Sequence, residues 1–210
     1  MAGVTTDATQ QHPAETFRSG AGRWLVIGFG LIAAFAATDA VITDGLTAIL
    51  TVWPWLAILV GGCWAIFWRP CVEVSDDQVR LVNVWHTVAV PWGALLGLDT
   101  KWALTLTTPK GTHRAWAAPA PGRTTMRHGS TDAKRVRDAA IAGQIRPGDL
   151  PSADSGAAAV MVRTAWNERR IAGDLDDVDP HALAVETRVH WLQVAVTVVL
   201  FAAAIAGLRV

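Results

Sequence analysis

The stretch LTAILTVWPWLAILVGGCWAIFW, residues 46–68, contains no charged side chain. Two further stretches have the same character. Residues 24–42, WLVIGFGLIAAFAATDAVI, carry Asp39 as their only charge, and residues 189–208, VHWLQVAVTVVLFAAAIAGL, carry none when His190 is neutral. The apolar core of a bilayer is ~30 Å thick and is crossed by about 20 apolar residues in a helix. The sequence therefore predicts three transmembrane helices, of which the first two form a hairpin.

Two other interpretations of the apolar stretches are open. The first is a helix buried in a soluble core, but such helices usually keep a polar stripe and these stretches have none. The second, for residues 24–42 alone, is a cleaved signal peptide. The small residues of AFAATDA, residues 34–40, suit cleavage, whereas the 23 residues before the stretch include Asp7 and Glu15 and differ from a short basic leader. We expect a membrane-inserted hairpin, with cleavage as its alternative.

Arginines beside the stretches predict their orientation, because cytoplasmic flanks of membrane helices are enriched in lysine and arginine. The link at residues 43–45 has neither, and Arg209 is a single charge after the third stretch. Trp24, Trp68 and Trp191 lie at stretch ends, where indole rings favour the headgroup layer. We expect a multi-pass protein of the plasma (inner) membrane, with its N-terminus and middle segment in the cytoplasm and the hairpin tip and C-terminus outside. The arginines that predict this are Arg18, Arg23, Arg69, Arg80, Arg169, Arg170 and Arg188.

Composition excludes several classes of protein. The 210 residues include 18 Lys and Arg and 18 Asp and Glu, so the net charge is zero, unlike that of a basic nucleic-acid binder. A hydrophobic fraction of 51% excludes a disordered chain, and two cysteines, Cys63 and Cys71, exclude a disulfide-rich scaffold. The six histidines lack zinc-helix spacing, and no GxSxG or SxxK motif supplies a nucleophile. We expect no enzyme activity, cofactor, metal site, nucleic-acid partner or small-molecule substrate.

The segment between residues 71 and 118 has a different pattern, in which short runs alternate apolar and polar residues. CVEV at residues 71–74 and LTLT at residues 104–107 are examples, and polar turns such as SDDQ separate such runs. Alternation with turn signals predicts an antiparallel sheet or a small barrel. About 50 residues are few for an independent core. We therefore expect a following helix to complete it, with TDAKRVRDAAIAGQ, residues 131–144, as the first helical segment and residues 157–172 as a second, amphipathic one.

The sequence from residue 69 to residue 99, RPCVEVSDDQVRLVNVWHTVAVPWGALLGLD, carries a family resemblance. It resembles the small bacterial PH domain of actinobacterial membrane proteins, the low-molecular-weight protein antigen type. The resemblance rests on the strand–turn–strand after a helical hairpin, on Val90-Pro91-Trp92, and on the Ala/Pro-rich stretch from Trp116. It implies a PH-like fold, which is a bent antiparallel sheet closed by a C-terminal helix. It supplies no catalytic residues.

The expected fold class is an α+β membrane protein with three transmembrane helices and a small PH-like antiparallel β domain with a C-terminal helix. Its expected divisions follow the patterns above. They are a disordered cytoplasmic N-terminus at residues 1–23, the transmembrane hairpin at 24–68, the PH-like domain at 69–146, a linker and amphipathic helix at 147–188, and the third span at 189–208. Structural roles are expected for Pro91, Trp92 and Trp116.

The segment from Lys101 to Arg146 is strongly basic, with nine Lys and Arg against Asp132 and Asp138. Anionic leaflets attract such segments, and the alternative, which we favour over specific lipid-headgroup recognition, is an ordinary solvated, positive-inside face. Exposed indoles near Lys101 or Arg114 would favour a binding surface. The predicted lipid- or partner-binding residues are Lys101, Lys110, Arg114, Arg123, Arg127, Lys134, Arg135 and Arg137.

Two functions follow as hypotheses. The first is a non-enzymatic membrane protein whose PH-like module binds anionic membrane lipid, or a membrane or cytoplasmic protein partner, at the cytoplasmic face. The alternative is an accessory subunit of a membrane transport or envelope-assembly complex that acts through its transmembrane helices. In the alternative, Gly28, Gly30 and Gly61 would allow close helix contacts.

Overall fold

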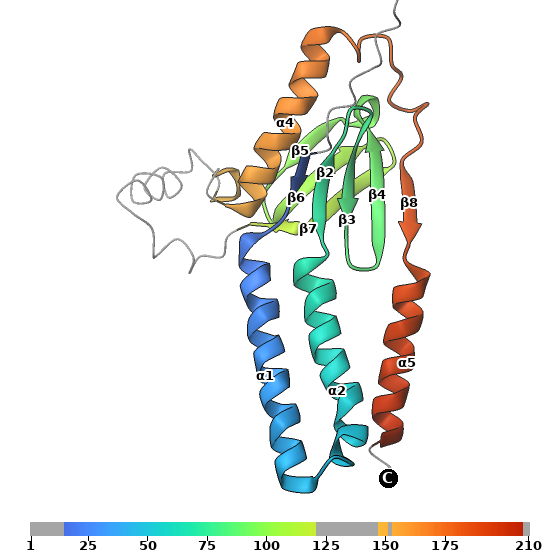
Figure 1. Ribbon diagram of the computed structural model, residues 1–210. Helices are drawn as coiled ribbons and strands as arrows, with labels where there is room; N and C mark the ends of the chain where they lie inside the picture. The colour runs from blue at the N-terminus through green and yellow to red at the C-terminus, as the bar shows by residue number, and fades with distance from the viewer. Residues whose placement is uncertain (1–14, 121–146, 151–152, 208–210) are drawn as a thin grey trace, which may run out of the picture.

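The alternating segments form strands and the apolar stretches form helices in the computed structural model, which describes residues 15–120, 147–150 and 153–207. The fold is α+β with antiparallel sheets (Figure 1). The helices are α1 (Gly20–Asp44), α2 (Ala48–Cys63) with a π-helical end (Trp64–Trp68), α4 (Asp154–Ala172) and α5 (Trp191–Gly207). Short 3-10 turns occur at Trp92–Ala94 and Pro147–Asp149. The strands are β1 (Glu15–Phe17), β2 (Cys71–Val74), β3 (Gln78–Val82), β4 (His86–Pro91), β5 (Gly97–Asp99), β6 (Ala103–Thr108), β7 (Gly111–Pro119) and β8 (Glu186–Val189).

The strands form two sheets. One has the order β1-β2-β3-β4-β8 and the other the order β5-β6-β7, and every pairing is antiparallel. The two outer strands of the five-stranded sheet come from distant parts of the chain. β1 lies before the first apolar helix, α1, and β8 lies just before the last one, α5. The two sheets meet where β7 contacts β2 and β3. This arrangement confirms the predicted antiparallel strands.

The core lies between the sheets and α4. Val72, Leu81, Leu104 and Leu106 are fully buried there, and Val162 reaches the same cluster from α4. Each such side chain contributes roughly 1.5–3 kcal/mol on burial. The helix expected to follow the β domain after residue 146 is thus part of its core. The helix predicted at residues 131–144 lies outside the described residues.

The prediction that residues 1–23 are disordered is wrong for residues 15–23. Residues Glu15–Phe17 pair with β2, with Phe17 opposite Val72, and α1 begins at Gly20. The phenylalanine side chain packs against the core cluster, so a short segment gains enough apolar contact to be ordered. The rest of this prediction, for residues 1–14, lies outside the described residues.

Two helices are long and apolar enough to cross a membrane. They are Gly20–Asp44 and Ala48–Trp68, and in each only 6% of the apolar window is buried by the protein. The low burial contradicts the interpretation of a soluble core helix, whose apolar face would be covered. The third apolar stretch forms α5, which has 17 residues. The three apolar helices lie side by side with α2 between α1 and α5 (Figure 1).

A glycine substitution tests how α1 and α2 pack. A Cβ atom at Gly22 would overlap the backbone carbonyl of Phe67, whereas a Cβ at Gly28 would meet nothing within 4 Å. We therefore expect Gly22→Val to lower the apparent melting temperature of the detergent-solubilised protein and Gly28→Val to leave it nearly unchanged. Circular dichroism during heating measures both. Equal effects of the two substitutions would contradict the packing.

Candidate functional site

The sheet and the apolar helices are joined by very short links. β1 ends at Phe17 and α1 begins at Gly20, the π-helical turn ends at Trp68 and β2 begins at Cys71, and β8 ends at Val189 just before α5. All three junctions lie at the same end of the five-stranded sheet, because Phe17 is opposite Val72 and His86 is opposite Val189. Figure 1 shows the helices extending from this end. The β domain is therefore held at three points with little freedom to move away.

The junction between β8 and α5 is fixed to the turn between β3 and β4. The backbone amide of His190 donates to the carbonyl of Trp85 at 2.9 Å. Trp85 lies in the β3–β4 turn, and its side chain is exposed. The turn between two central strands is thereby fixed beside the start of α5.

The second junction is that of α2. Arg69 Nη1 donates to the carbonyl oxygens of Asn83 and Val84 at 2.8 and 3.1 Å. Asn83, which is 1% exposed, donates from Nδ2 to the carbonyl of Arg114 at 3.0 Å and accepts from the amide of Trp116 at 2.9 Å. Two side-chain bridges thus place the middle of β7 next to the end of α2.

The third junction is that of α1. Ser19, the residue before α1, donates to the carboxylate of Asp154 at the start of α4, at 2.6 Å. The 3-10 turn before α4 is bound in turn to the β5–β6 loop, where Thr100 donates to Asp149. Lys101 and Trp102 follow in this loop. Lys101 and Trp102 therefore lie close to the start of α1, at the helix-proximal end of the β domain, which is the end joined to the apolar helices.

These three contacts gather exposed aromatic and basic side chains at one end of the β domain. We call this surface the base and define it as Trp85, Lys101, Trp102, Arg114 and Trp116. Trp102 is 70% exposed and Trp116 is 49% exposed. The ammonium of Lys101 lies 5.8 Å from the Trp102 ring centroid, a cation–π distance. The combination suits a layer of anionic groups next to apolar material, since indole and cationic side chains both favour such a layer.

The predicted site residues divide into three groups. Lys101 and Arg114 belong to the base, and Lys110 is exposed in the β6–β7 turn. The other five predicted basic residues lie outside the described part of the chain: Arg123, Arg127, Lys134, Arg135 and Arg137. The remaining predictions concern structural residues.

Trp92 and Pro91 differ from Trp116 in burial. Trp92 is 3% exposed and its indole donates to the carbonyl of Ser75 at 3.0 Å, so its ring is in the core. Pro91 is half-buried at the end of β4. The ring of Trp116 is not a core anchor, because β7 alternates and buries its neighbours Ala115 and Ala117 instead. Its expected structural role is corrected to a surface position.

Three histidines that are far apart in sequence gather near the same end of the domain. His86 Nε2 lies 3.2 Å from Asn83 Nδ2, and His190 Nε2 lies 3.0 Å from the Thr87 hydroxyl. Burial lowers the pKa of His113, and the nearby imidazole of His86 lowers it further. Sequence spacing gives no signal for this group, because its members come from β4, β7 and the β8–α5 junction.

The lowered pKa of His113 predicts a loss of stability in mild acid. An unfolded histidine has a pKa of ~6.5, so the folded state prefers the neutral ring and this preference is fully present above that pH. As pH falls below ~6.5, protonation favours the unfolded chain. We expect the melting temperature to fall over this range, and to fall less in His113→Gln. Heating scans at several pH values test this, with His181→Gln, an exposed loop position, as the matched control; an identical fall in His113→Gln would contradict it.

Other chemistry has weak support in the described residues. Within that part of the chain, no three His, Cys, Asp or Glu side chains are grouped to hold a metal ion. Cys63 and Cys71 are free thiols, and burial and the nearby Glu73 raise the pKa of Cys71. The sequence matches no protein-family model, and comparisons with curated proteins and with solved structures return no match. The base is therefore interpreted from its own chemistry.

Proposed function

We propose that the protein is a non-enzymatic, multi-pass protein of the inner membrane that holds a PH-like module against the cytoplasmic leaflet and binds anionic lipid through the base. The observation that carries this proposal is the position of the base. Its exposed indole and basic side chains surround the points where three apolar helices join the β domain. When these helices are in a membrane, the lipid headgroup layer lies beside the base.

The lengths of the helices support three spans. α1 has 25 residues, and a 17-residue helix such as α5 extends about 26 Å at 1.5 Å per residue. Spanning helices are as short as about 17 residues. Trp24, Trp68 and Trp191 lie at the ends of the helices nearest the base, and the arginine flanks are on the same side. By the positive-inside rule this side is cytoplasmic.

Two further features support a PH-like module. The two antiparallel sheets pack against each other, and α4 packs on both through Ala158, Ala159 and Val162. A bent sheet closed by a helix after its last strand is what the resemblance of residues 69–99 implies. In this proposal the closing helix is α4 rather than residues 131–144.

Lipid binding can be measured directly. The full chain is released from nanodiscs of mixed phosphatidylglycerol and phosphatidylcholine, and native mass spectrometry counts the retained lipids. We expect preferential retention of phosphatidylglycerol, reduced at least about tenfold in affinity by Lys101→Glu with Arg114→Glu, because each cation near the surface contributes ~1 kcal/mol. The matched control is Arg163→Glu with Arg170→Glu, which makes the same charge change on exposed positions of α4. Equal losses in both variants, or no preference in the native chain, would contradict the proposal.

One observation favours the alternative of an accessory subunit acting through its helices. Added Cβ atoms at Gly28, Gly30 and Gly61 would meet nothing within 4 Å, so these glycines make no close contact within the described chain. They are free to pack against a helix of another protein. Replacement of all three by leucine would abolish recovery of such a complex under the alternative, and would leave lipid retention by the base unchanged under our proposal.

A further inference from the structure

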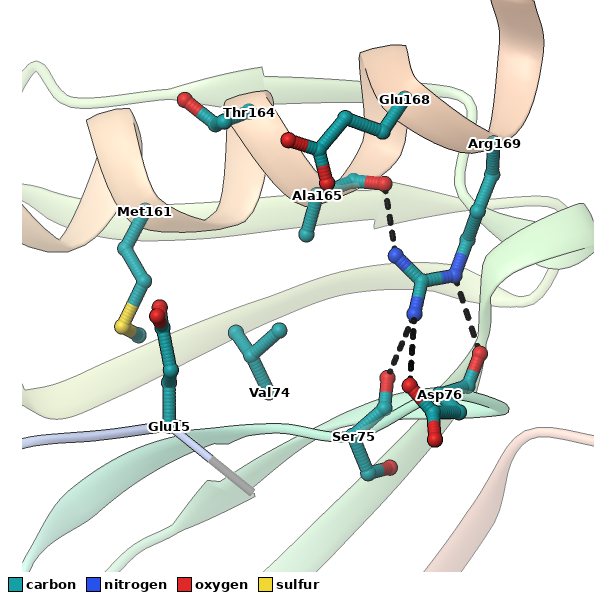
Figure 2. A pocket seen from close by; sticks show the side chains of 9 residues that line it. All are labelled: Glu15, Val74, Ser75, Asp76, Met161, Thr164, Ala165, Glu168 and Arg169. Atoms are coloured by element: carbon teal, nitrogen blue, oxygen red, sulfur yellow. Dashed lines mark hydrogen bonds and ion pairs between the residues drawn. The ribbon is translucent and has the colours of Figure 1, made fainter. Parts of the chain in front are cut away.

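A groove of about 540 Å³ lies between α4 and the edge of the five-stranded sheet (Figure 2). Its lower wall includes Val74 at the end of β2, and that end is opposite to the junction of β2 with α2. The groove is therefore directed away from the helix-proximal end and is distinct from the base. Its lining residues are Glu15, Val74, Ser75, Asp76, Met161, Thr164, Ala165, Glu168 and Arg169.

One end of the groove is closed by Arg169, whose guanidinium already has hydrogen-bond and ion-pair partners within the chain. Its Nε and Nη2 atoms donate to the carbonyls of Asp76 and Ser75 at 2.9 and 3.1 Å, and Nη1 donates to that of Ala165 at 2.7 Å. The guanidinium lies 4.6 Å from the ring centroid of Trp92 and 3.7 Å from the Asp76 carboxylate. It is a fixed wall, so it is not available to hold an anion.

Two carboxylates that have no partner in the described part of the chain face the open part of the groove. Figure 2 shows Glu15 rising from β1 beside Met161, and Glu168 descending from α4 over Ala165. Neither carboxylate has a hydrogen bond or ion pair with any residue of the described chain. The surface between them is formed by Val74 and the two apolar residues of α4. An aliphatic chain that ends in a cation matches this combination of apolar floor and negative walls.

The position of β1 favours a peptide over a free amine. β1 is the end strand of its sheet, so its outer backbone groups pair with no strand of the described chain. An extended peptide can hydrogen-bond to such an edge and place alternate side chains in the adjacent groove. A small amine would use the carboxylates but not this edge.

We propose that the groove binds an extended segment of a partner protein in which a lysine or arginine stands between apolar residues. The cation lies between Glu15 and Glu168, and its methylene groups lie on Met161 and Val74. This inference goes beyond lipid binding and rests on the proposed function only for placing the groove in the cytoplasm.

The test measures binding of a fluorescent, end-capped peptide of alternating valine and lysine to the full chain in nanodiscs. Fluorescence anisotropy of the peptide reports the binding. We expect saturable binding, weakened at least about tenfold by Glu15→Gln with Glu168→Gln, since charge-assisted contacts are the stronger ones. The matched control is Asp174→Asn with Asp177→Asn, the same charge change in the exposed loop after α4, and we expect less than a twofold effect there. The charge swap Glu15→Lys with Glu168→Lys should lose the lysine peptide and bind the same peptide with glutamate in place of lysine.

Each contrary result overturns the proposal. These results are no binding to the native chain, equal weakening in the control, and no rescue in the charge swap. A photo-crosslinker at Thr164 that attaches only to residues of the same chain would also overturn it, because the groove would then be filled from within. Phosphatidylglycerol retention by the Glu15→Gln/Glu168→Gln variant is measured in parallel. Retention should be unchanged, so failure of the groove is separable from failure of the base.

Discussion

Replacing Asn83 with alanine is expected to destabilise the β domain by about 3 kcal/mol. The side chain is 1% exposed and bridges the β3–β4 turn to β7 through the carbonyl of Arg114 and the amide of Trp116. Alanine leaves both backbone groups without these partners, and each such loss costs ~1–3 kcal/mol when the group is buried. Denaturant unfolding of the solubilised protein, followed by tryptophan fluorescence, measures the change.

The control for this substitution is Asn167→Ala, which removes an exposed amide from α4. Its effect on the free energy of unfolding should be close to zero, because the side chain is exposed and makes no hydrogen bond within the described chain, and alanine favours helix. Because Asn83 also positions β7 at the base, Asn83→Ala should reduce phosphatidylglycerol retention as well. A variant as stable as the native protein would show that the bridge does not hold the base together.

Replacing Trp92 with alanine is expected to cost about 3–5 kcal/mol of stability, the range for large aromatic residues removed from a core. The ring is 3% exposed, donates to Ser75, and supports the guanidinium of Arg169 on its face. Its loss creates a cavity and frees the residue that closes the groove. Heating or denaturant unfolding measures the stability.

The control is Trp102→Ala, which removes a ring that is 70% exposed. We expect it to leave the free energy of unfolding nearly unchanged while it weakens lipid retention at the base. The two tryptophans thus separate stability from surface binding. A comparable loss of stability in the two variants would contradict their assignment to core and surface.

The general architecture could be predicted from the sequence because it depends on local patterns. Long apolar stretches predict α1 and α2, and alternation predicts strands such as β2 and β6. The burial of Trp92 also follows from its place after Pro91 at a strand end. These signals depend on neighbours in sequence, so no tertiary contact is needed to detect them.

The candidate site could be predicted only in part, because it is assembled by contacts between distant segments. Lys101 and Arg114 stand out as basic residues, but their positions beside α1 and α2 depend on Ser19, Asp154 and Asn83. β1 pairs with a strand that follows two intervening helices, so nothing in its own three residues marks it as part of the sheet. The groove has the same origin, since its two glutamates come from β1 and α4.

The membrane orientation of the β domain is tested most directly by labelling intact cells with an impermeant maleimide. Both native cysteines are first removed by Cys63→Ala and Cys71→Ala. A single cysteine is then introduced in place of Asp44, in the hairpin tip, or of Lys110, in the β6–β7 turn, because Asp44 and Lys110 are both exposed. We expect the Asp44→Cys protein to be labelled on intact cells and the Lys110→Cys protein to be labelled only after permeabilisation. Labelling of the Lys110→Cys protein on intact cells would place the base outside the cytoplasm and contradict the proposed orientation.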